Sequence, residues 1–157
     1  MRSTLRKTLG SAGAALLLGT ALAVAGPAGP ATATVADCNH GANGFVDIPD
    51  NLSGSVARSV DLGNGRTVTL QYGNVYGAQR GWAKLSGATQ PTDLVWLDWT
   101  TNGGASWLQC GPFNADQGWG QSKTSAAMTT NASNQYLFRA CARIFSPVDT
   151  GRCTSWW

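Results

Sequence analysis

Hydrophobic and polar residues alternate with a period of two along most of the chain beyond residue 50, and no long stretch there has the 3.6-residue period of a helix. Clusters of Gly, Asn, Pro and Asp separate the alternating stretches, as they do between antiparallel strands. We predict strands at 56–62, 66–72, 81–86, 93–101, 105–110, 125–130, 135–145 and 152–157, with a turn at 146–151 before the last. Short strands in this number predict an all-β fold, either a small antiparallel β-sandwich, which we prefer, or a small β-barrel.

The turn Gly63-Asn64-Gly65 predicts a hairpin between the first two strands, because such a turn needs a residue that tolerates positive φ. Strand alternation then places Val68, Leu70 and Tyr72 on one face. In the third strand, Ala83 and Leu85 form the apolar face, and Trp82 alternates with them on the other face together with Lys84 and Ser86.

Asn102-Gly103 is a strong signal for a second hairpin, and a two-residue loop there would set its register. Leu97 would lie opposite Leu108, and Trp99 opposite Ser106. The predicted apolar face consists of Val95, Leu97, Trp99, Leu108 and Cys110. The opposite, wetter face consists of Trp96, Asp98, Trp107 and Gln109.

Residues 1–36 have the features of a secretory signal peptide: Arg2, Arg6 and Lys7, then an apolar segment at 14–25, then small residues. Cleavage after Ala36 is preferred to cleavage after Ala33. The apolar segment is shorter than the roughly 20 residues of a membrane span, so we expect a soluble secreted product. Residues 37–157 are then one domain, because this length supports a single core.

The net charge of +3 comes entirely from the predicted signal peptide, because arginine and lysine balance aspartate from residue 37 onward. The predicted mature domain therefore has no basic surface typical of proteins that bind nucleic acid or anionic membranes. We expect neither as a partner, and we expect a monomer.

The chain has four cysteines, Cys38, Cys110, Cys141 and Cys153, without the spacing of a metal site. In an exported domain this favours two disulfides. Three connectivities are possible. We prefer Cys38 with Cys110 and Cys141 with Cys153, because the second pair spans a short connection that contains Pro and Gly.

The chain has seven tryptophans, a large aromatic surface for a small domain. We predict that Trp82, Trp96 and Trp107 share an exposed face and stack on sugar rings, with hydrogen bonds from Asp98, Gln109 and Lys84. The predicted function is a secreted, non-catalytic module that binds carbohydrate or cell-wall polysaccharide. The alternative for the tryptophans themselves is that most of them are core residues.

The other predicted function is a secreted inhibitor of an extracellular hydrolase, with Arg80 or Arg143 as its anchor. Catalysis is not expected. His40 is the only histidine and has no evident partner, and Asp47 and Asp50 flank a proline in a turn. Asp98 begins a segment similar to an EF-hand loop, but Gln109 stands where that loop needs glutamate. We therefore predict no metal and no cofactor.

Two resemblances add to these expectations. The segment Thr100-Thr101-Asn102-Gly103-Gly104-Ala105-Ser106-Trp107 resembles the Asp-box, with Asn102 at the aspartate position, which implies a structural role in holding the turn. More loosely, the chain resembles small Trp-rich exported proteins of unassigned function that are common in actinobacteria, which implies a bacterial source. That second resemblance rests on Gly81-Trp82-Ala83-Lys84-Leu85, Val95-Trp96-Leu97-Asp98, Gly103-Gly104-Ala105-Ser106-Trp107 and Cys153-Thr154-Ser155-Trp156-Trp157.

Overall fold

The computed structural model describes residues 33–145 and 151–157. Nearly all of the predicted signal peptide, and residues 146–150 of the turn predicted at 146–151, lie outside the described residues. Two short 3-10 helices, η1 (Val35–Asp37) and η2 (Asn39–Gly44), precede the strands. The strands are β1 (Ser55–Gly63), β2 (Arg66–Val75), β3 (Ala78–Gly87), β4 (Leu94–Thr100), β5 (Leu108–Asn114), β6 (Lys123–Thr124), β7 (Met128–Thr129), β8 (Leu137–Arg143) and β9 (Gly151–Cys153).

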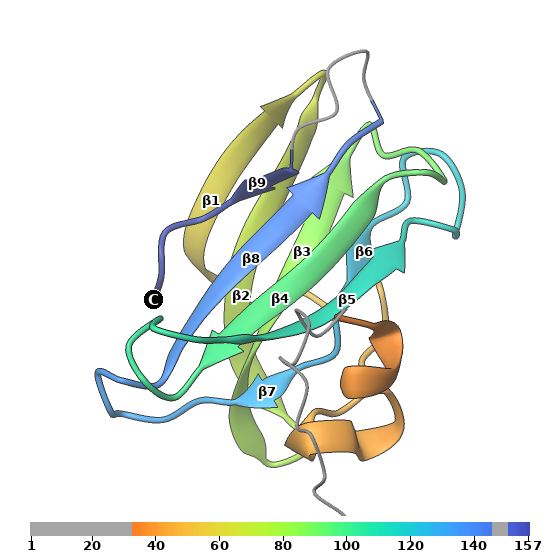
Figure 1. Ribbon diagram of the computed structural model, residues 1–157. Helices are drawn as coiled ribbons and strands as arrows, with labels where there is room; N and C mark the ends of the chain where they lie inside the picture. The colour runs from red at the N-terminus through yellow and green to blue at the C-terminus, as the bar shows by residue number, and fades with distance from the viewer. Residues whose placement is uncertain (1–32, 146–150) are drawn as a thin grey trace, which may run out of the picture. The chain divides into compact units, whose positions relative to one another are not determined.

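The strands form two antiparallel sheets that face one another (Figure 1). The first sheet has the order β1-β2-β3-β6, and β7 also pairs with β3. The second sheet has the order β5-β4-β8-β9. Over the described residues neither sheet closes on itself. The predicted β-sandwich is therefore confirmed, and the barrel alternative is wrong.

The core lies between the two sheets and is made by alternate residues of their strands. Val68 and Leu70 of β2 and Ala83 and Leu85 of β3 line it from the first sheet, and all four are fully buried. The second sheet contributes Val95, Leu97, Phe138, Ala140 and Ala142, which are buried as well. The apolar faces predicted for the second and third strands and for β4 are confirmed by the burial of these residues.

The β1–β2 hairpin has the predicted turn. Gly63 pairs with Arg66, so Asn64 and Gly65 form a two-residue loop, with φ of 53° and 70°. Positive φ at both positions is the requirement of a type I′ turn, and Asn-Gly meets it at little cost.

The β4–β5 hairpin differs from the prediction in its loop. Leu97 lies opposite Cys110 rather than Leu108, and Trp99 lies opposite Leu108 rather than Ser106. The loop between the two strands is longer than two residues because hydrogen bonds within the Asp-box-like segment hold residues 101–107 outside the ladder. A shift of two residues preserves alternation, so the predicted faces survive the wrong register.

Two disulfides link Cys38 to Cys110 and Cys141 to Cys153, and the preferred connectivity is confirmed. The first disulfide closes a separation of 72 residues. It joins β5 to the segment before β1, residues 33–54, which we call the N-terminal arm. The second joins directly paired residues of β8 and β9. The described residues contain no helix of the length and apolarity that crossing a membrane requires.

Strand β1 forms one edge of the first sheet. Its pairing with β2 is irregular at two places, between Val56 and Arg58 and between Asp61 and Gly63. Nη1 of Arg152, from β9 of the other sheet, donates a hydrogen bond of 3.1 Å to the carbonyl oxygen of Asp61. The edge of the first sheet is thus bridged to the second sheet.

Candidate ligand-binding surface

The outer face of the second sheet carries most of the residues predicted to bind a ligand. Gln109, Asp98 and Arg139 form one row across β5, β4 and β8, because Asp98 pairs with Gln109 on one side and with Arg139 on the other. Alternation points these side chains away from Leu97 and Phe138 of the core. Strand alternation and register together therefore bring a carboxyl group, a guanidinium group and an amide side by side.

Arg139 packs against two tryptophans, Trp107 and Trp156, whose own ring centroids lie 6.2 Å apart. Its Nε donates a hydrogen bond of 2.7 Å to Oδ2 of Asp98. Its guanidinium carbon lies 4.6 Å from the ring centroid of Trp107 and 4.5 Å from that of Trp156. Cation–π attraction favours this position, and the planar guanidinium suits stacking on indole rings. We call Trp96, Trp107, Gln109, Arg139 and Trp156 the Trp–Arg surface.

Trp107 and Trp96 sit differently on this surface. Trp107 is 49% exposed, so part of its indole is open to a ligand. Trp96 is half-buried and reaches toward β9, since a Cβ added at Gly151 would lie 3.3 Å from its Cη2. Trp107 is therefore the better candidate for direct contact.

Asp98 is buried, with 1% of its surface exposed, so its predicted place on an exposed, wet face is wrong. Its Oδ2 holds Arg139, and its Oδ1 has no hydrogen-bond partner among the described residues. Burial raises the pKa of this carboxyl, although the hydrogen bond and the charge of Arg139 act in the opposite direction. Asp98 is thus placed to orient Arg139 from beneath and not to contact a ligand.

The raised pKa of Asp98 predicts a specific pH dependence of stability. A carboxyl whose pKa rises on folding binds its proton more tightly in the folded state, so its contribution to the free energy of unfolding falls as the pH rises from about its ordinary value of 3.8 through the folded-state pKa. We expect the unfolding free energy of the wild type, minus that of Asp98→Asn, to fall over this range in urea titrations. A difference that increases with pH would show that Arg139 lowers the pKa of Asp98 by more than burial raises it.

The Cys141–Cys153 disulfide lies beside the Asp98–Arg139 pair, on the same face of the sheet. Sγ of Cys141 is 3.6 Å from Oδ2 of Asp98, and Asp98, Cys141 and Cys153 offer potential ligand atoms within 4.8 Å of one another. Both sulfurs are bonded to each other, so neither is a thiolate available to a metal. With the disulfide intact, this cluster is a packing feature and not a metal site.

Trp82 and Lys84 lie in the first sheet, where the N-terminal arm covers them. Trp82 is only 1% exposed and packs with Val75 and Ala127, and Val46, Ile48 and Leu52 pack against this group. The arm passes so close that a Cβ at Gly54 would lie 2.6 Å from Cη2 of Trp82. The prediction that Trp82 is exposed beside Trp96 and Trp107 is therefore wrong.

Lys84 is buried for the same reason. Its Nζ donates hydrogen bonds to the carbonyl oxygen of Leu52 at 2.6 Å and to Oγ of Ser53 at 2.9 Å, and burial lowers its pKa against the opposing charge of Asp50. Its ammonium group holds the arm on the sheet, so the expected exposed position of Lys84 is also wrong.

The Asp-box-like loop supports the Trp–Arg surface. Oγ1 of Thr100 donates to the carbonyl oxygen of Ser106 at 2.6 Å and accepts from the amide of Gly104 at 3.2 Å. Oδ1 of Asn102 accepts from the amide of Ser106 at 3.0 Å, the structural role that the resemblance implies. Trp156 packs on this loop, since a Cβ at Gly104 would lie 3.3 Å from its Nε1.

Sequence reasoning missed Arg139 and Trp156 as members of the surface. The signal for both was present in the preferred disulfide. Pairing Cys141 with Cys153 lays the C-terminal segment beside β8, which brings Trp156 toward Arg139 two residues before Cys141. Strand alternation then gives Arg139 the same face as Cys141.

The acidic residues near the N-terminus are engaged in contacts within the protein, and those of Asp50 join the N-terminal segment to β6. Nδ1 of His40 lies 3.6 Å from Oδ2 of Asp47, with 91% of the histidine side chain exposed. Asp50 accepts a hydrogen bond of 3.1 Å from Nζ of Lys123, and its Oδ1 accepts another of 3.1 Å from the amide of Thr124. These contacts are typical of residues that hold loops in place.

Comparisons with known proteins do not indicate a function, so the functional argument rests on the geometry of the Trp–Arg surface. A scan against protein-family models, a search of curated proteins and a search of solved structures each found no match.

Proposed function

We propose that this protein is a secreted carbohydrate-binding module that binds polysaccharide through the Trp–Arg surface. One observation carries the proposal: the Arg139 guanidinium packs against both Trp107 and Trp156, whose rings also contact each other edge to face, and Trp107 remains 49% exposed beside it. A group held by several mutual contacts of this kind is ordered before a ligand arrives. Rigid aromatic surfaces bind with a smaller loss of conformational entropy than mobile ones.

The chemistry of the surface suits sugars. Indole rings offer broad apolar faces, and sugar rings present C–H groups that pack against them. Gln109 and Arg139 supply N–H donors at the side of the rings for sugar hydroxyls. The charge of Arg139 is balanced by Asp98 at 2.7 Å, which favours an uncharged polymer over a strongly anionic one.

The two disulfides fit an oxidising, extracellular environment. Cleavage after Ala36 and export to the medium remain predictions from the sequence. A polysaccharide of the bacterial cell wall or of plant material is the partner we propose for a module in that environment.

The inhibitor alternative has weaker support from its proposed anchors. Arg80 is half-buried, and its Nε donates to the carbonyl oxygen of Val75 at 3.3 Å, so it does not project as an anchor side chain would. Arg143 is exposed at the end of β8, but it lies on the same face as the Trp–Arg surface and not on a protruding loop. We retain the inhibitor only as an outcome of the experiment below.

Trp107→Ala should weaken binding to insoluble polysaccharide by about tenfold or more, because it removes the most exposed ring of the surface and a contact of this kind contributes on the order of 2 kcal/mol. The measurement is retention of the purified protein on cellulose, chitin and peptidoglycan, with the melting temperature recorded for each variant. We expect the melting temperature of Trp107→Ala to stay close to that of the wild type.

Trp119→Ala is the matched control, because Trp119 is 71% exposed and lies outside the Trp–Arg surface. It should bind like the wild type. Equal losses in both variants would point to nonspecific adsorption through exposed indoles. Failure of the wild type to bind any of the three polymers, with stoichiometric inhibition of a secreted hydrolase instead, would overturn the proposal in favour of the inhibitor.

A further inference from the structure

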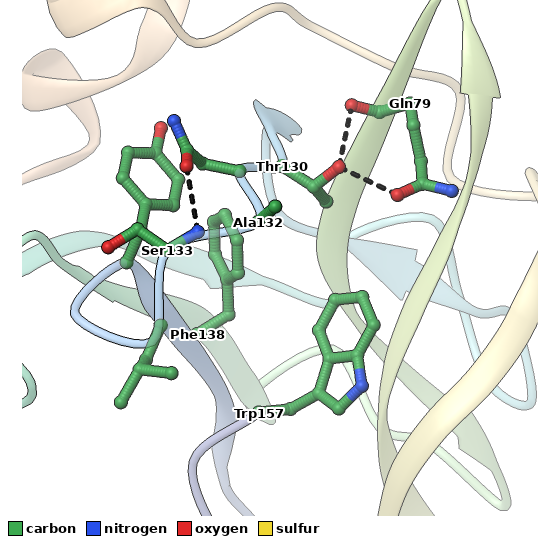
Figure 2. Close-up of a pocket in the computed structure, with 9 residues that line it drawn as sticks. Gln79, Thr130, Ala132, Ser133, Phe138 and Trp157 are labelled. Atoms are coloured by element: carbon green, nitrogen blue, oxygen red, sulfur yellow. Dashed lines mark hydrogen bonds between the residues drawn. The ribbon is translucent and has the colours of Figure 1, made fainter.

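A separate hollow lies where the C-terminal segment meets the loop between β7 and β8 (Figure 2). Its volume is about 290 Å³, and its lining includes Phe138, Trp157, Tyr136, Gln79 and Asn131. It shares no lining residue with the Trp–Arg surface. A volume near the lower end of small-ligand pockets, roughly 300 Å³, suits one ring and not a polymer chain.

The hollow has a fixed aromatic wall, in which Trp157 and Tyr136 are partly exposed and Phe138 is almost fully buried. The ring of Trp157 stacks on Tyr72 with a centroid separation of 4.9 Å, and Phe138 lies 6.5 Å from Trp157 and 5.5 Å from Tyr136. Phe138 and Trp157 also exchange two backbone hydrogen bonds of 2.9 Å. These contacts hold the wall in place without a ligand.

The rim presents amide N–H groups whose orientation is set by the protein. Oε1 of Gln79 accepts a hydrogen bond of 2.8 Å from Oγ1 of Thr130 (Figure 2). Oδ1 of Asn131 accepts one of 2.9 Å from the amide of Ser133. With both oxygens engaged, the Nε2 and Nδ2 donors have no hydrogen-bond partner within the described part of the chain. They are available to acceptor oxygens of a ligand.

The absence of charged side chains in the lining restricts the class of ligand that the hollow can bind. No side chain that lines the hollow is ionised at neutral pH, and burial raises the pKa of the Tyr136 phenol further above neutrality. An anionic ligand would lose its hydration without a cationic side chain in the lining to pair with. An aromatic wall with an uncharged rim of amides and hydroxyls matches a ring that is apolar on its face and hydroxylated at its edge.

We infer that this hollow is a second binding site, which takes one neutral sugar ring, either a free monosaccharide or the end of a chain. The inference does not depend on the Trp–Arg surface, because the two sites have separate residues. A protein with both sites would bind polymer on one face and a single sugar residue at the other site.

The test is titration of the isotopically labelled protein with neutral sugars at millimolar concentration, followed by ¹H–¹⁵N NMR. The probes are glucose, xylose and N-acetylglucosamine, with methyl glycosides and short oligosaccharides to separate free sugars from chain ends. With the monosaccharides and methyl glycosides we expect saturable shifts of the Trp157 indole N–H and of the side-chain amides of Gln79 and Asn131, and no comparable shift at the Trp107 indole.

Isosteric variants test the contribution of the amide donors at the rim separately from the aromatic wall. Gln79→Glu and Asn131→Asp each keep the oxygen that accepts the internal hydrogen bond and remove the N–H donors, so they should stay folded and bind the sugar at least tenfold more weakly. Asn64→Asp introduces the same change in a turn outside the hollow and should bind normally. Trp107→Ala should also bind the sugar normally, even if it no longer binds polymer.

Three results would overturn the inference. One is the lack of saturable shifts at Trp157 with every neutral sugar. A second is binding of an apolar probe such as indole while sugars do not bind. The third is unchanged sugar affinity in both rim variants. Each of these leaves the Trp–Arg surface untouched, so failure here is distinct from failure of the proposed function.

Discussion

Trp82→Ala should lower the free energy of unfolding by about 3–5 kcal/mol, the cost of truncating a large buried aromatic residue. The side chain is 1% exposed, and the N-terminal arm crosses it at Gly54, so a large cavity would form and the arm would lose its main apolar contact. Urea denaturation followed by circular dichroism measures the change. A loss of this size is a large share of the 5–15 kcal/mol typical of a domain.

Trp119→Ala serves as the control here as well, since an exposed tryptophan should change stability by no more than about 0.5 kcal/mol. Near-native stability of Trp82→Ala would mean that the arm does not cover the first sheet. The exposed position predicted for Trp82 by strand alternation would then be correct after all.

Replacing Cys38 and Cys110 together by serine should cost about 4 kcal/mol, because the disulfide closes a separation of 72 residues and restricts the unfolded chain. Both cysteines are fully buried, so the serine hydroxyls would add a cost for burying polar groups. Chemical denaturation of the oxidised double variant measures the effect.

The comparison is the double variant of Cys141 and Cys153, whose separation of 12 residues predicts a smaller loss of about 3 kcal/mol in the same model. A larger loss in this second variant than in the first would contradict the assignment of the main stabilising role to the long loop. It would instead point to packing of the second disulfide against Asp98.

Features that depend on neighbouring residues could be predicted from the sequence. The turn at Asn64-Gly65 needs only two residues with positive φ, and the burial of Val68 and Leu70 follows from alternation. The same local rule placed Trp96, Asp98 and Gln109 on one side of the second sheet. The disulfide pairing followed from the short connection between its last two cysteines.

Features that depend on distant segments could not be predicted in this way. Alternation assigns Trp82 and Lys84 to the face away from the core, but it does not reveal that residues 45–54 return to cover that face. Likewise, the burial of Asp98 depends on Arg139, 41 residues further along the chain. The binding surface was thus predicted in part, with its central arginine missing.

The irregular pairing of β1 has a consequence for the behaviour of the protein at high concentration. An open edge strand offers unpaired amides and carbonyls to the strands of other molecules, which is a common route to aggregation. The two interruptions in β1 disturb the straight hydrogen-bonding row that a second molecule would need, and the contact from Arg152 occupies the carbonyl oxygen of Asp61. This edge should therefore resist strand-to-strand association between copies, even though Val56 leaves an apolar side chain in solvent there.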